Sequence, residues 1–188
     1  GMKLDWQNPE IKWLNDERPH VVQRSMKVLA REENIEHLKE SDARLPALWT
    51  LHRVPGNEAR KAVRDFLNDD RSEVRAAAIH SIGLWRDPEP VDRLIDFLGS
   101  EDPLLVRLSA MALGRIGNVK ALKPLIEAGS KGADKFLNHA VTYALYEIGE
   151  TDNLPIRNQI ADQVRTMIRV DEGAPSPHAM PDIKMANA

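Results

Sequence analysis

The chain has no cysteine and few aromatic residues, which make up 5% of its 188 positions. Without cysteine it has no disulfide, no thiolate metal ligand, no cysteine nucleophile and no covalent haem attachment through Cys-x-x-Cys-His. The low aromatic content and the 29% of charged residues suit helices packed through Ala, Leu, Ile and Val better than a β-sandwich. These absences indicate an all-helical protein and remove the thiol-based chemistries.

The chain also has a small net charge and no long apolar segment. The formal net charge is -3, so no basic surface is indicated and nucleic-acid binding has no electrostatic support. No apolar run approaches the roughly 18 residues that a membrane-spanning helix needs. We therefore expect neither nucleic acid nor a membrane span. Gly1 before Met2 is typical of an expression remnant, so the compartment stays open and an exported parent protein is one alternative.

What the chain does have is a repeat with a period of 31 residues. Three segments recur at this interval: Leu51-His52-Arg53, Ile82-Gly83-Leu84 and Leu113-Gly114-Arg115. Each is followed by a turn and a second apolar stretch, and these stretches keep the interval: Val63, Leu94 and Leu125. A period in the thirties with two helical patterns per unit predicts a stacked helical solenoid.

The repeat predicts an all-α, right-handed superhelix of about five helix pairs. First helices are expected over residues 16–30, 43–51, 74–85, 103–116 and 137–148, and return helices over 33–40, 59–67, 90–98, 119–128 and 155–169. We expect an N-terminal cap over residues 1–15, the solenoid over 16–169 and a disordered, proline-rich tail over 170–188. The predicted buried residues are Ile79, Ile82, Leu94, Ala110, Leu113, Leu125 and Leu145.

Val74–Ala78 with Ile82-Gly83, and Val106–Ala110 with Leu113–Gly117, resemble HEAT repeats. They are most similar to the short HEAT-like class named after phycobilisome (PBS) lyases. The resemblance extends over residues 16 to 168 and is strongest over 69–149. It implies an armadillo-type solenoid that binds a protein, and it leaves chromophore attachment, or a chaperone for that reaction, as an alternative.

A narrower resemblance involves Phe136–Ala140 with Tyr143–Leu145, together with Leu48–Arg53. These segments are similar to the HEAT segment of large planctomycete-type dehydrogenases that carry a haem domain, where it is a spacer between a propeller and a cytochrome. The resemblance implies flanking domains, and this chain contains neither of them. No redox residue carries over, so we expect no cofactor.

Histidines and carboxylates give no recognisable catalytic or metal motif. No two of the six histidines have the i, i+4 spacing of a helical zinc pair, and His-Glu-x-x-His does not occur. His52 and His139 lie inside the motifs above, and we interpret them as structural hydrogen-bonding residues. The carboxylates are numerous but form no recognisable catalytic pair. We therefore predict no catalytic residue and no metal site.

Arg44, Arg75 and Arg107 recur early in the first helices. They would form a ladder for an anionic partner. Their register is imperfect, because Arg107 lies one position beyond the 31-residue spacing from Arg75. We favour the alternative in which these arginines pair with acidic turns, such as those of Asp70 and Asp102.

The return helices carry two rows of charged positions. Packing of the apolar residues of 91–98 inward leaves Asp92 and Asp96 facing out. The repeat then gives an acidic row, Asp65, Asp96 and Glu127, and an alternating row, Lys61, Asp92 and Lys123. In solenoids of the resembled type the second helices line the concave side, so these six residues are candidates for a binding surface. Ion pairing within and between repeats is the alternative that we favour.

Taken with the repeat, these patterns predict a non-enzymatic scaffold that binds a protein partner or spaces the domains of a larger protein. An extended surface arises more readily than a closed pocket when each repeat contacts only its neighbours. An enzyme would need titratable groups that converge in one pocket, and the sequence indicates none.

Overall fold

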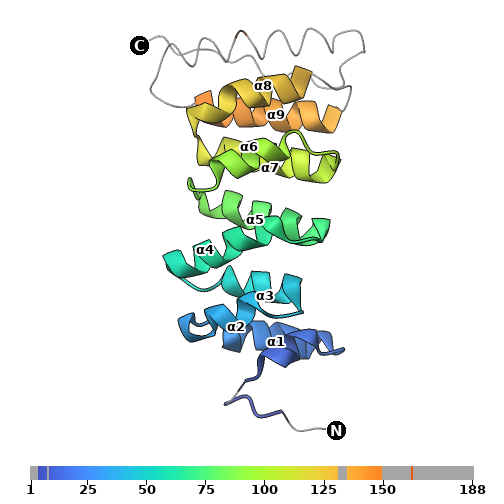
Figure 1. Cartoon of the computed structure of the whole chain (residues 1–188), viewed down its shortest axis with the longest axis vertical. Coiled ribbons are helices and arrows are strands. Elements are labelled where there is room, and N and C mark those ends of the chain that lie inside the picture. The colour runs from blue at the N-terminus through green and yellow to red at the C-terminus, as the bar shows by residue number, and fades with distance from the viewer. Residues whose placement is uncertain (1–3, 8, 131–134, 150–161, 163–188) are drawn as a thin grey trace.

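The computed structural model describes residues 4–7, 9–130, 135–149 and 162. Within these residues it contains nine α-helices, four 3-10 helices and no strand. The helices follow one another along a single elongated stack, with α1 and α2 near one end and α8 and α9 near the other (Figure 1). This arrangement confirms the predicted all-helical solenoid.

Each repeat has a first and a second helix. The first helices are α1 (Pro19–Leu29), α3 (Arg44–Leu51), α5 (Ser72–Trp85), α7 (Pro103–Ile116) and α9 (Lys135–Gly149). The second helices are α2 (Ile35–Lys39), α4 (Asn57–Asp65), α6 (Val91–Phe97) and α8 (Leu122–Ser130). The 3-10 helices are η1 (Ile11–Asn15), η2 (Glu32–Asn34), η3 (Phe66–Asn68) and η4 (Val119–Ala121). Four helix pairs and the first helix of a fifth are thus described.

Local sequence signals explain where several helices begin and end. The side chain of Asp102 caps α7 by accepting a hydrogen bond from the backbone N–H of Leu104 at 2.9 Å, and Pro103 occupies the first turn. Gly117 ends α7 with a φ of 75°, the left-handed conformation that glycine adopts without a Cβ clash. Arg86 ends α5 in the same region, with a φ of 51°, although it is not glycine.

Several helix limits differ from the predicted ones by one to three residues. The segment predicted as one helix over 33–40 begins as η2 and becomes α2 only at Ile35. Helix α4 begins at Asn57, two residues before its predicted start. Helix α8 runs through Gly129 to Ser130, beyond its predicted end at Ala128. There the Ser130 hydroxyl donates to the Ile126 carbonyl at 2.8 Å, and Gly129 is buried, so packing outweighs the helix-breaking tendency of glycine.

The first helices pack on one another in chain order and form a continuous layer of the stack. A Cβ at Gly83 of α5 would lie 3.1 Å from Ala112 of α7, and one at Gly114 would lie 2.5 Å from the Cα of Ala144 in α9. Glycine at these positions lets the helix backbones approach closely. The seven residues predicted to be buried all have 0% exposure.

The N-terminal residues that the structure describes include η1, which packs against α1 and α3. Its Trp13 and Leu14 are buried, and the Trp6 ring meets Trp13 edge-on with centroids 5.2 Å apart. The predicted closing helix over 155–169, apart from position 162, and the predicted tail over 170–188 lie outside the described residues. The division into cap, solenoid and tail therefore stays a proposal.

Candidate functional site

The six charged residues predicted on the return helices are all exposed. Helix α4 carries Lys61 and Asp65, α6 carries Asp92 and Asp96, and α8 carries Lys123 and Glu127. Between them, Ala62, Val63, Leu94 and Leu125 are buried and fix which side of each helix faces the core. We call the six exposed residues the second-helix face.

Five of these six residues form ion pairs. Two pairs join different elements: Lys39 lies 3.5 Å from Asp65, and Lys120 lies 2.5 Å from Asp92. Two others lie within one helix: Arg93 is 3.8 Å from Asp96, and Lys123 is 3.9 Å from Glu127. This is the ion pairing expected as the alternative to a binding surface. Exposed pairs of this kind are screened by water and contribute little to stability, so the same side chains stay available to a partner.

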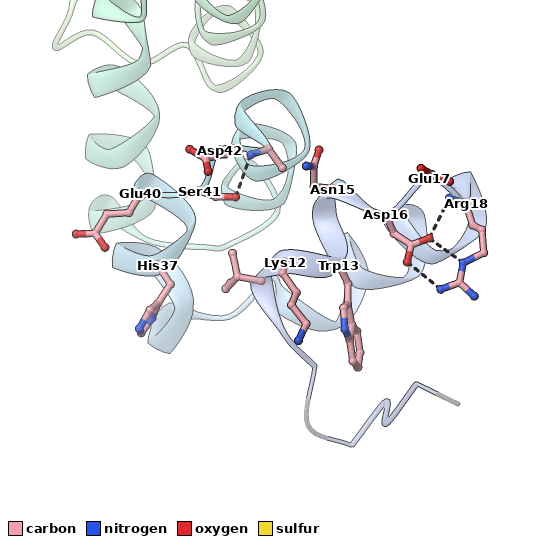
Figure 2. Close-up of a pocket in the computed structure, with 12 residues that line it drawn as sticks. Lys12, Trp13, Asn15, Asp16, Glu17, Arg18, His37, Glu40, Ser41 and Asp42 are labelled. Carbon is pink, nitrogen blue, oxygen red and sulfur yellow. Dashed lines mark hydrogen bonds and ion pairs between the residues drawn. The ribbon is translucent and has the colours of Figure 1, made fainter. Parts of the chain in front are cut away.

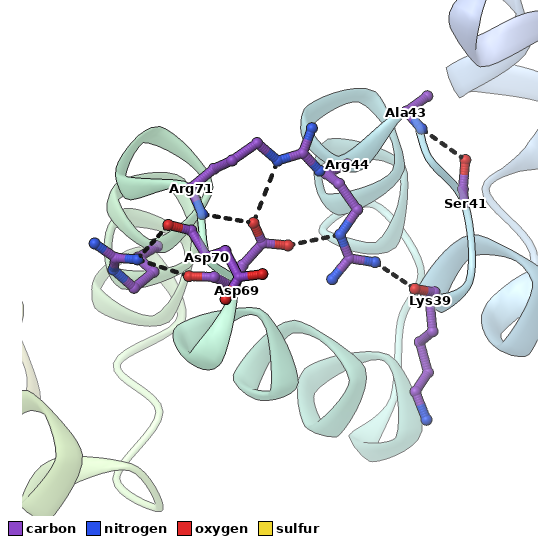
Figure 3. A network of polar contacts seen from close by, with 8 residues as sticks. Lys39, Ser41, Ala43, Arg44, Asp69, Asp70 and Arg71 are labelled. Carbon is purple, nitrogen blue, oxygen red and sulfur yellow. Dashed lines mark hydrogen bonds and ion pairs between the residues drawn. The ribbon is translucent and has the colours of Figure 1, made fainter.

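Two of the three arginines of the predicted ladder, Arg44 and Arg75, contact acidic turns, whereas Arg107 forms no ion pair with another described residue. Arg44 donates from Nε to Asp69 Oδ2 at 2.7 Å and also to the Lys39 carbonyl (Figure 3). Arg75 donates to the main-chain carbonyls of Asp69 and Asp70 at 2.7 and 2.9 Å. These two arginines therefore join consecutive elements of the stack and are not free to form an anion site.

Asp69 is the centre of this network. Its carboxylate also accepts from the backbone N–H of Arg71 at 3.1 Å and from Arg71 Nε at 3.3 Å. Burial opposes ionisation, but the hydrogen bonds from Arg44 and Arg71 outweigh it and lower the pKa of Asp69. In the next repeat Asp102 accepts a hydrogen bond from the Ser72 hydroxyl, which lowers the pKa of Asp102. Ionised carboxylates thus link neighbouring repeats.

A second inter-repeat ion pair joins α4 to the turn between α5 and α6. Arg64 binds Asp87 through two parallel contacts, Nε to Oδ2 at 2.8 Å and Nη2 to Oδ1 at 3.1 Å. The Asp87 side chain is 1% exposed and also accepts from the Glu89 backbone N–H. A buried carboxylate without hydrogen-bond and charge partners is strongly destabilising, so this pair has a structural role.

His52 lies in a cluster of rings that joins α3 to α5. Its Nδ1 is hydrogen-bonded to the Ser81 hydroxyl, and its ring stacks on Trp85 with centroids 4.6 Å apart. Trp49 meets both His52 and His80 edge-on. Burial, with the charges of His80 and Arg53, lowers the pKa of His52. The structural role expected for His52 is confirmed.

His139 differs from the expectation. It is exposed on α9 and meets the Tyr143 ring with centroids 6.5 Å apart. No hydrogen bond joins its ring to another described residue. The residue faces outward because Ala140 and Val141, which follow it, take the buried positions of the helix.

A pocket with a volume of about 810 Å³ lies at the N-terminal end of the stack. Its lining comes from η1, the turn between η1 and α1, and α2 with the turn that follows it (Figure 2). Figure 2 shows the charged side chains spread around its rim, with His37 on one side and Asp16 and Arg18 on the other. Hydrogen bonds from Arg18 lower the pKa of Asp16 to about 2, so this carboxylate is not a proton donor near neutral pH. The pocket has no convergent acid–base pair.

Sequence reasoning missed a set of exposed apolar side chains on the first helices. Among the described residues, those that are large, apolar and exposed are Leu84, Leu104, Met111, Val119, Phe136, Tyr143 and Tyr146, and all except Val119 belong to α5, α7 or α9. The 31-residue spacing of Trp49, His80 and Met111 was an available signal, because it places three large side chains at equivalent positions.

The described residues also show no metal-binding cluster and no membrane-spanning helix. In the part of the chain that the structure describes, no group of three or more His, Asp or Glu side chains is placed to hold a metal ion. No described helix is both long and apolar enough to cross a membrane.

Comparison with known families gives one match. HEAT repeats match the chain over residues 29–107 and again over 61–146. Together the two matches extend over more than half of the chain and cover most of the helices from α2 to α9. No curated protein matches the sequence.

Proposed function

Because this chain belongs to the HEAT repeat family, we propose that it is a non-catalytic scaffold whose second-helix face binds a protein partner. The observation that carries the proposal is the register of the six charged residues. They lie at equivalent, exposed positions of three successive second helices, so they offer one extended surface and not isolated charges. HEAT repeats are typical of helical scaffolds, which supports the non-catalytic part.

The acidic row defines the expected partner. Asp65 and Glu127 flank Asp96, and all three carboxylates are exposed. A basic segment that follows the stack would contact each in turn, and its lysines or arginines would compete with the weak pairs from Lys39, Arg93 and Lys123. We therefore expect the partner to present a basic, extended segment.

A charge-reversal experiment tests this surface. The triple variant Asp65→Lys/Asp96→Lys/Glu127→Lys should lose a partner that wild-type protein captures from extracts of the source organism. The matched control reverses three exposed acids elsewhere, Glu17→Lys/Glu89→Lys/Glu101→Lys, and should keep that partner. Both variants should melt close to the wild type, since surface substitutions usually change stability by about 0.5 kcal/mol or less. Equal recovery by all three proteins would contradict the proposal.

Two narrower functions rest on the resemblances of the sequence. A spacer role between domains is supported by the segments around His52 and His139, which are similar to part of the haem-domain dehydrogenases. Chromophore attachment to a phycobiliprotein is supported only by the repeat class itself. Sequence that flanks this chain in its gene separates them: propeller and haem-binding segments favour the spacer, and neighbouring phycobiliprotein genes favour the lyase-like role.

A further inference from the structure

A second surface, chemically unlike the second-helix face, runs along the outer side of the first helices. Leu84 of α5 is 50% exposed, Met111 of α7 is 37% exposed, and Tyr143 and Tyr146 of α9 are 60% and 50% exposed. Side chains of this size are normally covered when they gather on one face, and a contiguous exposed apolar patch marks an interaction site.

The repeat places these residues in line. Leu84, Arg115 and Tyr146 are each 31 residues apart, so they take equivalent positions on the three successive first helices α5, α7 and α9. Arg53, a further 31 residues before Leu84, lies in the turn after α3. Met111 lies one turn before Arg115, as Arg107 lies one turn before Met111, so the three form a single stripe along α7. Tyr143 and Tyr146 are three residues apart and share one side of α9.

Close packing makes the surface continuous across helices. The Cδ of Arg115 lies 3.9 Å from where a Cβ at Gly83 would be, so the side chain of α7 reaches across to α5 beside Leu84. Glu147 reaches from α9 to α7 in the same way, with its Oε2 beside Gly114. We call Leu84, Arg107, Met111, Arg115, Tyr143 and Tyr146 the first-helix strip.

The two arginines of the strip carry positive charge that no ion pair within the strip neutralises. Neither Arg107 nor Arg115 forms an ion pair with another described residue, and the same holds for Arg53 in the adjoining repeat. Glu147 is the acid that lies closest to the strip along α9. Tyrosine and arginine are enriched among the residues that dominate binding energy at interfaces, and the two unpaired arginines beside the apolar side chains of the strip favour a partner of opposite charge.

We propose that the first-helix strip docks an acidic amphipathic helix of another protein, laid along the stack across α5, α7 and α9. Adjacent packed helices lie about 8–10 Å apart. Seven residues of α-helix advance about 10.5 Å, so apolar side chains spaced about seven residues apart would meet one first helix each. Acidic residues beside these anchors would reach Arg107 and Arg115. This surface is distinct from the second-helix face, and neither proposal depends on the other.

The test is a selection from a phage-displayed library of 18-residue helical peptides on the full-length protein. Selected peptides are synthesised, and their affinities are measured by fluorescence polarisation against three proteins. These are the wild type, the strip variant Leu84→Glu/Arg115→Glu and the control Gln23→Glu/Lys27→Glu, which makes the same change in net charge at exposed positions of α1. A milder strip variant, Arg107→Gln/Arg115→Gln, keeps the test valid if the glutamates disturb the fold, which circular dichroism monitors.

The proposal expects peptides with apolar residues about seven apart and a clear excess of Asp and Glu. Their affinity should fall by about tenfold or more for Leu84→Glu/Arg115→Glu, the loss that follows when a central contact worth about 1.4 kcal/mol is removed. It should weaken with added salt and stay unchanged for the control. Basic peptides, peptides that bind wild type and both strip variants equally, or a selection without enrichment would each overturn the proposal.

Discussion

The first-helix strip and the second-helix face belong to the same repeats, yet they expose opposite chemistry. The strip presents Leu84, Met111 and two tyrosines beside unpaired arginines, whereas the second-helix face presents charges that are mostly paired with their neighbours, such as Asp92 with Lys120. The difference follows from packing. The inner sides of α5, α7 and α9 are tied closely together, and their outer sides keep large apolar residues that the core does not use. A regular charge pattern therefore does not by itself identify the surface most available to a partner.

The largest effect should come from the packing beneath the strip. Leu113 is fully buried on the inner side of α7, so Leu113→Ala removes buried methyl groups and leaves a cavity. We expect a loss of about 2–5 kcal/mol in the free energy of unfolding, measured by urea denaturation. The exposed Lys123→Ala on the second-helix face is the control and should change little. A loss below about 1 kcal/mol for Leu113→Ala would contradict the packing described.

A smaller loss of stability should follow from adding a methyl group at either of the two close-packed glycines, and the loss should differ between them. A Cβ at Gly114 would meet the backbone of Ala144 at 2.5 Å, but one at Gly83 would lie 3.1 Å from Ala112. Gly114→Ala should therefore destabilise by about 1–3 kcal/mol through overpacking, and Gly83→Ala by less. Alanine favours helix over glycine by about 1 kcal/mol, which offsets part of each cost. Thermal melts of both variants test this order of stability. A melting temperature of Gly114→Ala above that of Gly83→Ala would contradict it.

The ring cluster between α3 and α5 should make stability depend on pH. The pKa of His52 is lowered in the folded state, so the unfolded chain binds more protons. Stability should fall as pH drops below the ordinary histidine value of about 6.5. His52→Gln removes this component, so melting temperatures at pH 7.5 and pH 5 should differ less in the variant than in the wild type. Both carboxylates with lowered pKa at the repeat junctions, Asp69 and Asp102, stay ionised in this range.

The smallest effect should come from the end of α5. Arg86 has a φ of 51°, a conformation that costs a residue with a Cβ more than it costs glycine. Arg86→Gly should stabilise the protein by a few tenths to about 1 kcal/mol, because relief of this strain exceeds the added freedom of the unfolded chain. Gly117→Ala should instead lower the free energy of unfolding, because it places a Cβ at a residue whose φ is 75°. Denaturation midpoints of the two variants decide the matter.

Much of the fold was predictable because the repeat carries its own register. The 31-residue spacing located the paired helices, and Asp102 and Gly117 marked the ends of α7. The six second-helix residues were predictable as exposed for the same reason. Whether they bind a partner depends on chemistry that the partner brings, so no pattern in this chain decides it.

The strip was not predictable from apolar periodicity. Helix α5 is apolar around most of its circumference. Five residues over positions 74–79 are buried: Val74, Ala76, Ala77, Ala78 and Ile79. An additional leucine at position 84 then looks like another core residue. The end of α8 escaped prediction because burial of Gly129 overrides its helix-breaking tendency, and the conformation of Arg86 escaped it because no glycine marks that turn.

The glycine contacts also bear on how the stack would come apart. Stability in a solenoid is roughly a sum of repeat and nearest-neighbour terms, and α5, α7 and α9 pack along more of their length than α1 does on α3 or α3 on α5. Amide protons inside α7 should therefore exchange with solvent most slowly, while those of α1 and α2 exchange through local fraying. Folding would then nucleate between α5 and α9 and spread toward the N-terminus, which leaves the first repeats free to adjust their angle without loss of the central layer.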